Sequence, residues 1–192
     1  MPPDPIQVAL TVAEALEHCG LRYLVGGSLS SSLSGEPRST LDVDLVVSMS
    51  DDDVRPFVNR LGDQFHVEPD SLRRAIRDRS STNLIHYETS MKVDLFIVGG
   101  SVLDEQQMDR RQRVLVATDP DRHLYFYTPE DILLQKLNWY RKGDEVSDRQ
   151  WRDILGIVLV QTALDEEYLR DGARRLGVID LLDRALLEGR SS

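Results

Sequence analysis

The sequence lacks several features that would assign it to a specialised class of protein. Cys19 is its single cysteine among 192 residues, which excludes an internal disulfide and fits a reducing compartment. No Cys/His cluster suggests structural zinc. No apolar run approaches the roughly 20 residues of a membrane span, and the first residues carry no basic segment of the kind that opens a signal peptide. We therefore expect a cytoplasmic, globular protein that does not enter a membrane.

Basic residues are also in short supply. Lys and Arg together number 23 against 33 Asp and Glu, which gives a net charge of −10, and such a balance argues against broad, non-specific binding of nucleic acid. A local contact stays open, because four arginines fall on one expected helix, either as a solvated face or as a phosphate-contacting patch: Arg73, Arg74, Arg77 and Arg79. Two nucleotide-binding motifs are absent, G-x-x-x-x-G-K-[ST] and G-x-G-x-x-G, so neither a P-loop nor a Rossmann site is expected.

The hydrophobic pattern predicts alternating helices and strands, followed by a helical end. Expected helices cover residues 4–18, 28–34, 50–61 and 70–77, and expected strands cover 21–25, 42–47, 65–67, 82–87, 91–98, 112–117 and 123–127. Four further helices are expected at 129–141, 148–162, 165–176 and 178–187. This is a mixed α/β (α+β) protein with a core at 1–128 and a helical region at 129–192, whose apolar last helices either pack internally or build a homodimer.

The stretch from residue 23 to 47, YLVGGSLSSSLSGEPRSTLDVDLVV, concentrates the chemistry. In a strand, alternate residues share a face, so Asp42 and Asp44 lie side by side, where two carboxylates repel unless a cation neutralises them. Gly26 and Gly27 allow the backbone to approach a ligand closely. If Ser28 begins a helix, its hydroxyl and the free N–H groups form an anion site. A phosphate cradle beside paired carboxylates suits a nucleoside triphosphate with Mg²⁺.

A third carboxylate, Asp94, lies inside the apolar segment MKVDLFIV. A buried carboxylate needs a partner, because its desolvation is costly. One interpretation is a metal ion shared with Asp42 and Asp44. The other places Asp94 at a strand end, exposed or paired with Lys92 or an arginine. Both remain open at this point.

These residues resemble the signature of the nucleotidyltransferase superfamily, which includes DNA polymerase beta, aminoglycoside nucleotidyltransferases and minimal bacterial nucleotidyltransferases. In that signature a Gly-Ser turn opens a helix, an acidic pair follows on the next strand, and a third acidic residue comes later. The matching positions are Gly27-Ser28, Asp42 with Asp44, and Asp94. The segment RSTLDVDLVV is similar to the corresponding segment of stand-alone bacterial members, including AbiEii-type toxins. Residues 127–154 resemble the helical C-terminal portion of these proteins.

The resemblance implies a nucleotidyltransferase core with a mixed sheet, flanking helices and a C-terminal helical region. It implies Mg²⁺- or Mn²⁺-dependent transfer of a nucleoside monophosphate from an NTP such as ATP to a hydroxyl of RNA, protein or a small molecule, in the setting of a toxin with a cognate antitoxin. The metal ligands and catalytic residues would be Asp42, Asp44 and Asp94. Nucleotide and phosphate contacts would come from Gly26, Gly27, Ser28, Arg38, Thr40 and Lys136.

Several alternatives accompany this interpretation. The domain could be a weak or inactive binding or regulatory protein, such as an antitoxin subunit, or a metal-dependent phosphohydrolase. Lys136 lies among apolar residues, where a lysine stem often only snorkels to water. The resemblance matches Arg141, Asp148 and Asp153 to pocket residues less firmly.

Overall fold

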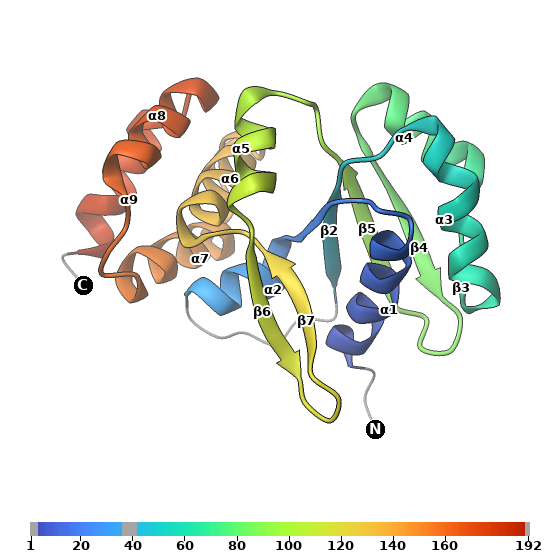
Figure 1. Cartoon of the computed structure of the whole chain (residues 1–192). Helices are drawn as coiled ribbons and strands as arrows, with labels where there is room; N and C mark the ends of the chain where they lie inside the picture. Colours follow the sequence, from blue (N-terminus) through green and yellow to red (C-terminus); the bar gives the residue numbers. More distant parts are fainter. Residues whose placement is uncertain (1–3, 36–41, 191–192) are drawn as a thin grey trace. The chain divides into compact units, whose positions relative to one another are not determined.

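The computed structural model of the chain describes residues 4–35 and 42–190, and these divide into two compact units (Figure 1). Of the described residues, the first unit takes 4–29 and 42–126, and the second takes 30–35 and 127–190. The predicted boundary after residue 128 lies two residues beyond the point where the chain enters the second unit. Residues 30–35, which we expected in the core, group with the C-terminal helices.

Within the described residues, the first unit is built on a seven-stranded sheet of order β3-β4-β5-β2-β1-β7-β6. The strands are β1 (Tyr23–Val25), β2 (Val43–Val47), β3 (Phe65–His66), β4 (Ser81–His86), β5 (Lys92–Ile97), β6 (Gln112–Ala117) and β7 (Arg122–Phe126). The pairs β2–β5 and β1–β7 are parallel and the other pairs are antiparallel. The sheet is therefore mixed, which confirms the predicted fold class.

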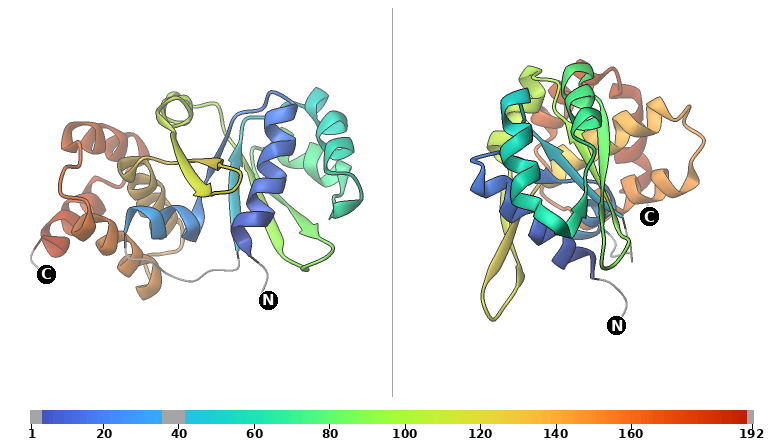
Figure 2. Two further views of the ribbon diagram at one scale, coloured as in Figure 1. Left: turned by 60° about the horizontal axis from the view of Figure 1, so that its bottom comes forward. Right: turned by 90° about the vertical axis from the view of Figure 1, so that its right-hand side faces the viewer.

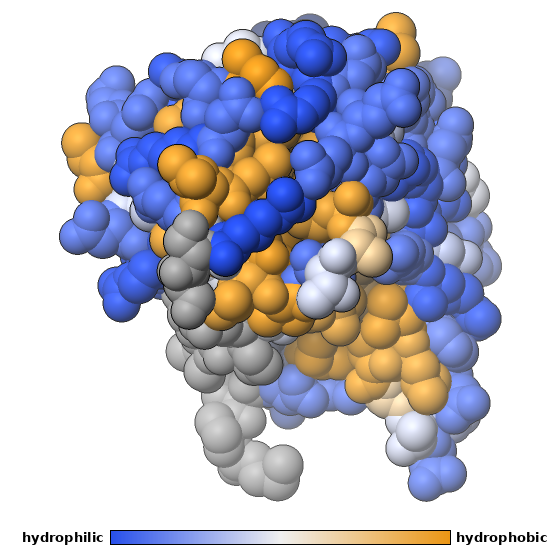
Figure 3. Space-filling view, turned by 90° about the vertical axis from the view of Figure 1, so that its left-hand side faces the viewer, coloured by the Kyte–Doolittle hydropathy of each residue, from blue (hydrophilic) through white to orange (hydrophobic). Residues whose placement is uncertain are grey.

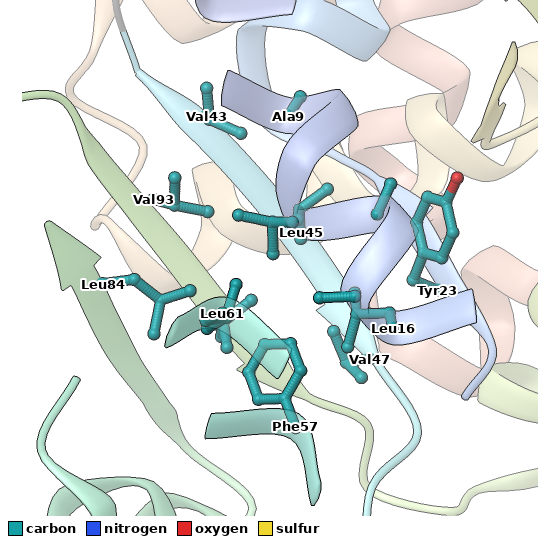
Figure 4. Close-up of a cluster of buried hydrophobic side chains, with 14 of the residues drawn as sticks. Ala9, Leu16, Tyr23, Val43, Leu45, Val47, Phe57, Leu61, Leu84 and Val93 are labelled. Carbon is teal, nitrogen blue, oxygen red and sulfur yellow. The ribbon is translucent and has the colours of Figure 1, made fainter. Parts of the chain in front are cut away.

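One face of this sheet carries the hydrophobic core. Along β2, Val43, Leu45 and Val47 are buried while the residues between them are half-buried, as the alternation of strand side chains requires. Helices α1 (Pro5–His18), α3 (Val54–Leu61) and α4 (Pro69–Asp78) bury their apolar stripes in the same cluster. Figure 4 shows Leu16 of α1 and Phe57 of α3 beside the strand residues, and the views in Figure 2 show the blue and teal helices against the sheet. The second face of β2 carries the half-buried Asp44 and Val46.

Capping residues explain where the helices of the first unit begin. The Asp4 side chain accepts from the Ile6 N–H at the start of α1, and Ser50 forms a capping box with Asp53 ahead of α3, both as the sequence indicates. Helix α4 begins at Pro69, one residue before the expected start at 70, with Glu68 as its N-cap, because Pro69 suits the first helical position.

One α-helix of this unit, α5 (Val102–Arg110), was not predicted from the sequence. The Ser101 side chain accepts from the Asp104 N–H, and the Asp104 side chain accepts from the Ser101 N–H, forming a capping box. The Ser-x-x-Asp spacing that announces such a box was present in the sequence. The apolar periodicity of α5 is weak, since it buries only Leu103, Gln107 and Met108.

The second unit is helical. It holds the later residues of α2 (Gly27–Ser34) together with α6 (Pro129–Lys142), α7 (Asp148–Val160), α8 (Glu166–Leu176) and α9 (Ile179–Gly189). The side chain of Gln161, at the end of α7, donates to the Ser34 carbonyl at 2.7 Å, which ties α2 to this unit. Figure 3 faces the C-terminal helices and shows apolar residues exposed among hydrophilic ones. The exposed large apolar side chains of α6–α9 and their connections are Trp139, Val146, Leu159, Val160 and Leu187.

Among the helices of residues 4–35 and 42–190, none combines the length and the apolar character needed to cross a membrane.

Candidate functional site

Two of the predicted carboxylates face each other across the middle of the sheet. Strands β2 and β5 pair in parallel with Asp44 directly opposite Asp94, and Val43 opposite Val93. Both aspartates are half-buried, and they share the face that the core does not occupy. Asp42 is exposed and comes immediately before β2, so strand periodicity gives it the same face as Asp44. The pairing thus brings together carboxylates that are distant in the sequence.

The Gly-Gly-Ser turn meets this carboxylate pair. Strand β1 ends at Val25, and the N–H of Gly26 donates to the Asp44 carbonyl at 2.9 Å. Gly27 begins α2 with a φ of +54°, and a Cβ atom at this position would lie 1.7 Å from Asp44 Oδ2. No side chain fits there while the Asp44 carboxylate keeps its position, so glycine allows the turn to approach Asp44 closely. The helix thus begins one residue before the predicted start, and Ser28 is its second residue.

A lysine already accompanies the acidic residues. Lys92 Nζ lies 2.8 Å from Asp94 Oδ2, with the lysine side chain 47% exposed and the aspartate 23% exposed. The hydrogen bond to Asp94, and then the negative charges of Asp94, Asp42 and Asp44, raise the pKa of the Lys92 ammonium. Asp94 is therefore paired with Lys92, as one alternative proposed, but at an interior position of β5 rather than at a strand end.

The chemistry of these side chains suits a hard divalent cation, which prefers carboxylate oxygens. Because Gly27 has no side chain, there is space for the Asp44 carboxylate beside the turn. Asp42 and Asp94 lie on the same face of the sheet as Asp44. The donor set therefore fits Mg²⁺ in kind. Within residues 4–35 and 42–190, however, no group of three His, Cys, Asp or Glu side chains has an arrangement that could hold a metal ion. Lys92 supplies the positive charge at Asp94 instead.

The predicted phosphate contacts outside the turn have different outcomes. Arg38 and Thr40 lie outside the described residues. Lys136 lies in α6, and its Nζ is 2.7 Å from Asp153 Oδ2 of α7, with side chains only 13% and 15% exposed. Lys136 therefore has a partner within its own unit and does not simply snorkel to water.

Arg141 and Asp148, which the resemblance matched to pocket residues, lie among other residues of the second unit. Arg141 pairs with Asp180 at 2.6 Å and with Glu145 at 2.8 Å, and Asp148 is the first residue of α7. Tyr140 packs against Trp151 with ring centroids 5.1 Å apart, as expected for helix packing. In the first unit, Arg79 ends α4 in a left-handed conformation and donates to the Val98 carbonyl, so it does not continue the arginine face of that helix.

We expect Lys136→Met to destabilise the second unit by about 2–3 kcal/mol, because it removes the ammonium from a mostly buried carboxylate. The double variant Lys136→Met/Asp153→Leu is expected to regain much of this loss, since both ends of the pair become apolar. Urea unfolding followed by tryptophan fluorescence measures both variants. A double variant that is less stable than Lys136→Met alone contradicts a structural role for this pair.

The fold of this chain is similar to that of solved structures, although its sequence is not close to theirs. No protein-family model matches the sequence, and the search of curated proteins finds no match. Among solved structures the chain is similar to an antigenic nucleotidyltransferase-like protein from Paracoccidioides brasiliensis, with a TM-score of 0.58, 18% identity, and coverage of 97% of this chain and 94% of that one.

It is also similar to the lincosamide antibiotic adenylyltransferase LnuA in its lincomycin-bound form. There the TM-score is 0.51 and the identity 15%, over 82% of this chain and 96% of the adenylyltransferase. At such identities the likeness shows the fold alone.

Proposed function

We propose that this protein transfers a nucleoside monophosphate from an NTP to a hydroxyl group. The observation that carries the proposal is the pairing of Asp44 with Asp94 across β2 and β5, directly beside a turn in which Gly27 has no room for a side chain. Two adjacent carboxylates on a half-buried strand face are costly for folding alone, which favours a functional reason for keeping them. The similarity of the fold to an adenylyltransferase supports the same reaction class.

In the proposed reaction the acceptor hydroxyl oxygen bonds to the α-phosphorus of the NTP, and the bond from that phosphorus to the β-phosphate oxygen breaks, releasing pyrophosphate. Asp94 accepts the hydroxyl proton. Asp42 and Asp44, with Asp94, would hold Mg²⁺ or Mn²⁺, which when bound neutralises the charge of the triphosphate. Gly26, Gly27 and Ser28 would contact phosphate oxygens through N–H and hydroxyl groups.

A second candidate function is that of a binding or regulatory protein that keeps the fold without the reaction. The ion pair of Lys92 with Asp94 favours it, because a lysine that neutralises Asp94 permanently would make a metal ion unnecessary. A phosphohydrolase is a third candidate, which would release phosphate from the NTP without labelling an acceptor.

The test is a transfer assay with each NTP in turn, labelled either at the α- or at the γ-phosphate, in Mg²⁺ or Mn²⁺. The acceptors are tRNA, total cell protein, the protein itself and a panel of small hydroxyl compounds. We expect α-label on one acceptor class in the wild type and none in Asp42→Ala/Asp44→Ala. Bound NTP without transfer supports the binding protein, and γ-label released as free phosphate without an acceptor supports the hydrolase.

The other parts of the proposal concern the acceptor, a toxin role and the oligomeric state. The net charge of −10 favours a small molecule or a protein over a long nucleic acid as the acceptor. A toxin role in the cytoplasm would appear as growth arrest on expression, relieved by a cognate antitoxin and absent in the Asp42→Ala/Asp44→Ala variant. The exposed apolar side chains of α7 and α9 support a homodimer, and light scattering of the purified protein measures it.

A further inference from the structure

The acidic face of β2 and β5 also carries one basic residue, Lys92, whose position follows from the strand register. Asp44 is opposite Asp94, and Val43 is opposite Val93. Asp42 precedes Val43 as Lys92 precedes Val93. By strand periodicity, Asp42 and Asp44 on one strand and Lys92 and Asp94 on the next all belong to the same face. Three carboxylates and one ammonium thus share a small surface.

The ammonium acts on all three carboxylates. It contacts Asp94 directly at 2.8 Å, and its electrostatic partners include Asp42 and Asp44 as well. Without it, the face would hold three neighbouring negative charges that repel one another. With it, the net charge of the group falls to −2, which is also the charge that one divalent cation would neutralise.

We propose that Lys92 is a built-in counter-ion that competes with the divalent metal for Asp94 and so lowers the affinity of the site for metal. This inference rests on the proposed function, because it takes Asp42, Asp44 and Asp94 as the metal ligands. In the metal-free protein Lys92 holds the carboxylates together. When the metal binds, Asp94 exchanges its ion pair with Lys92 for coordination, and the flexible, half-exposed lysine side chain moves toward water.

Lys92 is in this account a positioning residue, which sets the metal concentration that the site needs. It takes no part in the transfer of the proton or of the nucleoside monophosphate. A variant without the charge should bind metal more tightly, whereas a variant that keeps the charge should not.

The test is the binding of Mn²⁺ alone, without nucleotide, measured by the loss of the free-ion signal in electron paramagnetic resonance. Lys92→Met is expected to lower the dissociation constant about threefold to tenfold, because it removes one competing positive charge from a half-exposed pair. Lys92→Arg is expected to bind like the wild type. Arg77→Met is the matched control, since this exposed arginine of α4 belongs to the helix that covers the core face, and its loss changes the net charge equally.

A second measurement uses stability. In EDTA at low salt, Lys92→Met is expected to have a lower melting temperature than Lys92→Arg, and saturating Mn²⁺ is expected to raise its melting temperature more than that of the wild type. The rise in melting temperature with Mn²⁺ occurs only if there is a metal site. The difference in melting temperature between Lys92→Met and Lys92→Arg in EDTA needs only the repulsion among the carboxylates.

The outcomes separate this inference from the proposed function. Mn²⁺ binding by the wild type with equal or weaker binding by Lys92→Met overturns the role of Lys92 and leaves the transferase proposal standing. Tighter binding by both Lys92→Met and Arg77→Met also overturns it, because the effect would then come from net charge alone. Absence of binding in the wild type and in Lys92→Met overturns the inference together with the metal site. Binding that appears only in Lys92→Met supports it most strongly.

Discussion

Replacing Gly27 by alanine is expected to reduce nucleotidyl transfer by at least about a hundredfold, because a displacement of about 1 Å in a catalytic group can cost that much. The new Cβ would lie 1.7 Å from Asp44 Oδ2 and 2.6 Å from the carboxylate carbon. Atoms cannot approach so closely, so the Asp44 carboxylate has to leave its position opposite Asp94. The loss should come near that of removing the carboxylate itself.

The chain offers a control for this variant. Gly20 has a positive φ of +71°, as Gly27 has one of +54°, but a Cβ at Gly20 would meet nothing within 4 Å. Gly20→Ala therefore carries a positive-φ backbone penalty, about 1–2 kcal/mol, without touching a carboxylate. We expect it to keep the transfer activity of its folded fraction. Equal activity in Gly27→Ala and Gly20→Ala would show that the position of Asp44 does not matter for the reaction.

The second large effect is expected on stability, at Asp131 near the start of α6. This aspartate is fully buried. It accepts from the Thr128 hydroxyl at 2.8 Å and from the Tyr168 hydroxyl at 2.6 Å, while its own N–H donates to the Thr128 hydroxyl. The carboxylate thus links the first turn of α6 to α8. We expect Asp131→Ala to destabilise the second unit by about 3 kcal/mol, since it removes the acceptor of the buried Thr128 hydroxyl and of the half-buried Tyr168 hydroxyl and opens a cavity.

Both tryptophans, Trp139 and Trp151, lie in the second unit, so their fluorescence in urea follows that unit specifically. Asp148→Ala is the control, because it also removes an acidic residue from a first helical turn, but an exposed one, at a cost of about 0.5 kcal/mol. Tyr168→Phe should fall between them, at about 1.5–2 kcal/mol, since it deletes one hydrogen bond to the carboxylate. An Asp131→Ala protein as stable as Asp148→Ala would contradict this account.

Local patterns were enough to predict most of the elements. The boundaries of α6, α7 and α9 were predicted to within about two residues, because capping and apolar periodicity act over a few neighbouring positions. The acidic pair Asp42 and Asp44, and the glycine turn before α2, could be read in the same way. The helix α5 was missed despite its capping box, because its apolar stripe is too weak to be seen as periodicity.

The sequence by itself determined which residues are chemically unusual: a carboxylate pair at a strand start, an acidic residue inside an apolar strand, and glycines before a short helix. Only the tertiary structure decided that Asp44 is opposite Asp94, that Gly27 abuts the Asp44 carboxylate, and that Lys92 pairs with Asp94. The register of two parallel strands depends on the packing of the whole sheet, because the crossover between them can be closed in many ways that local preferences do not distinguish.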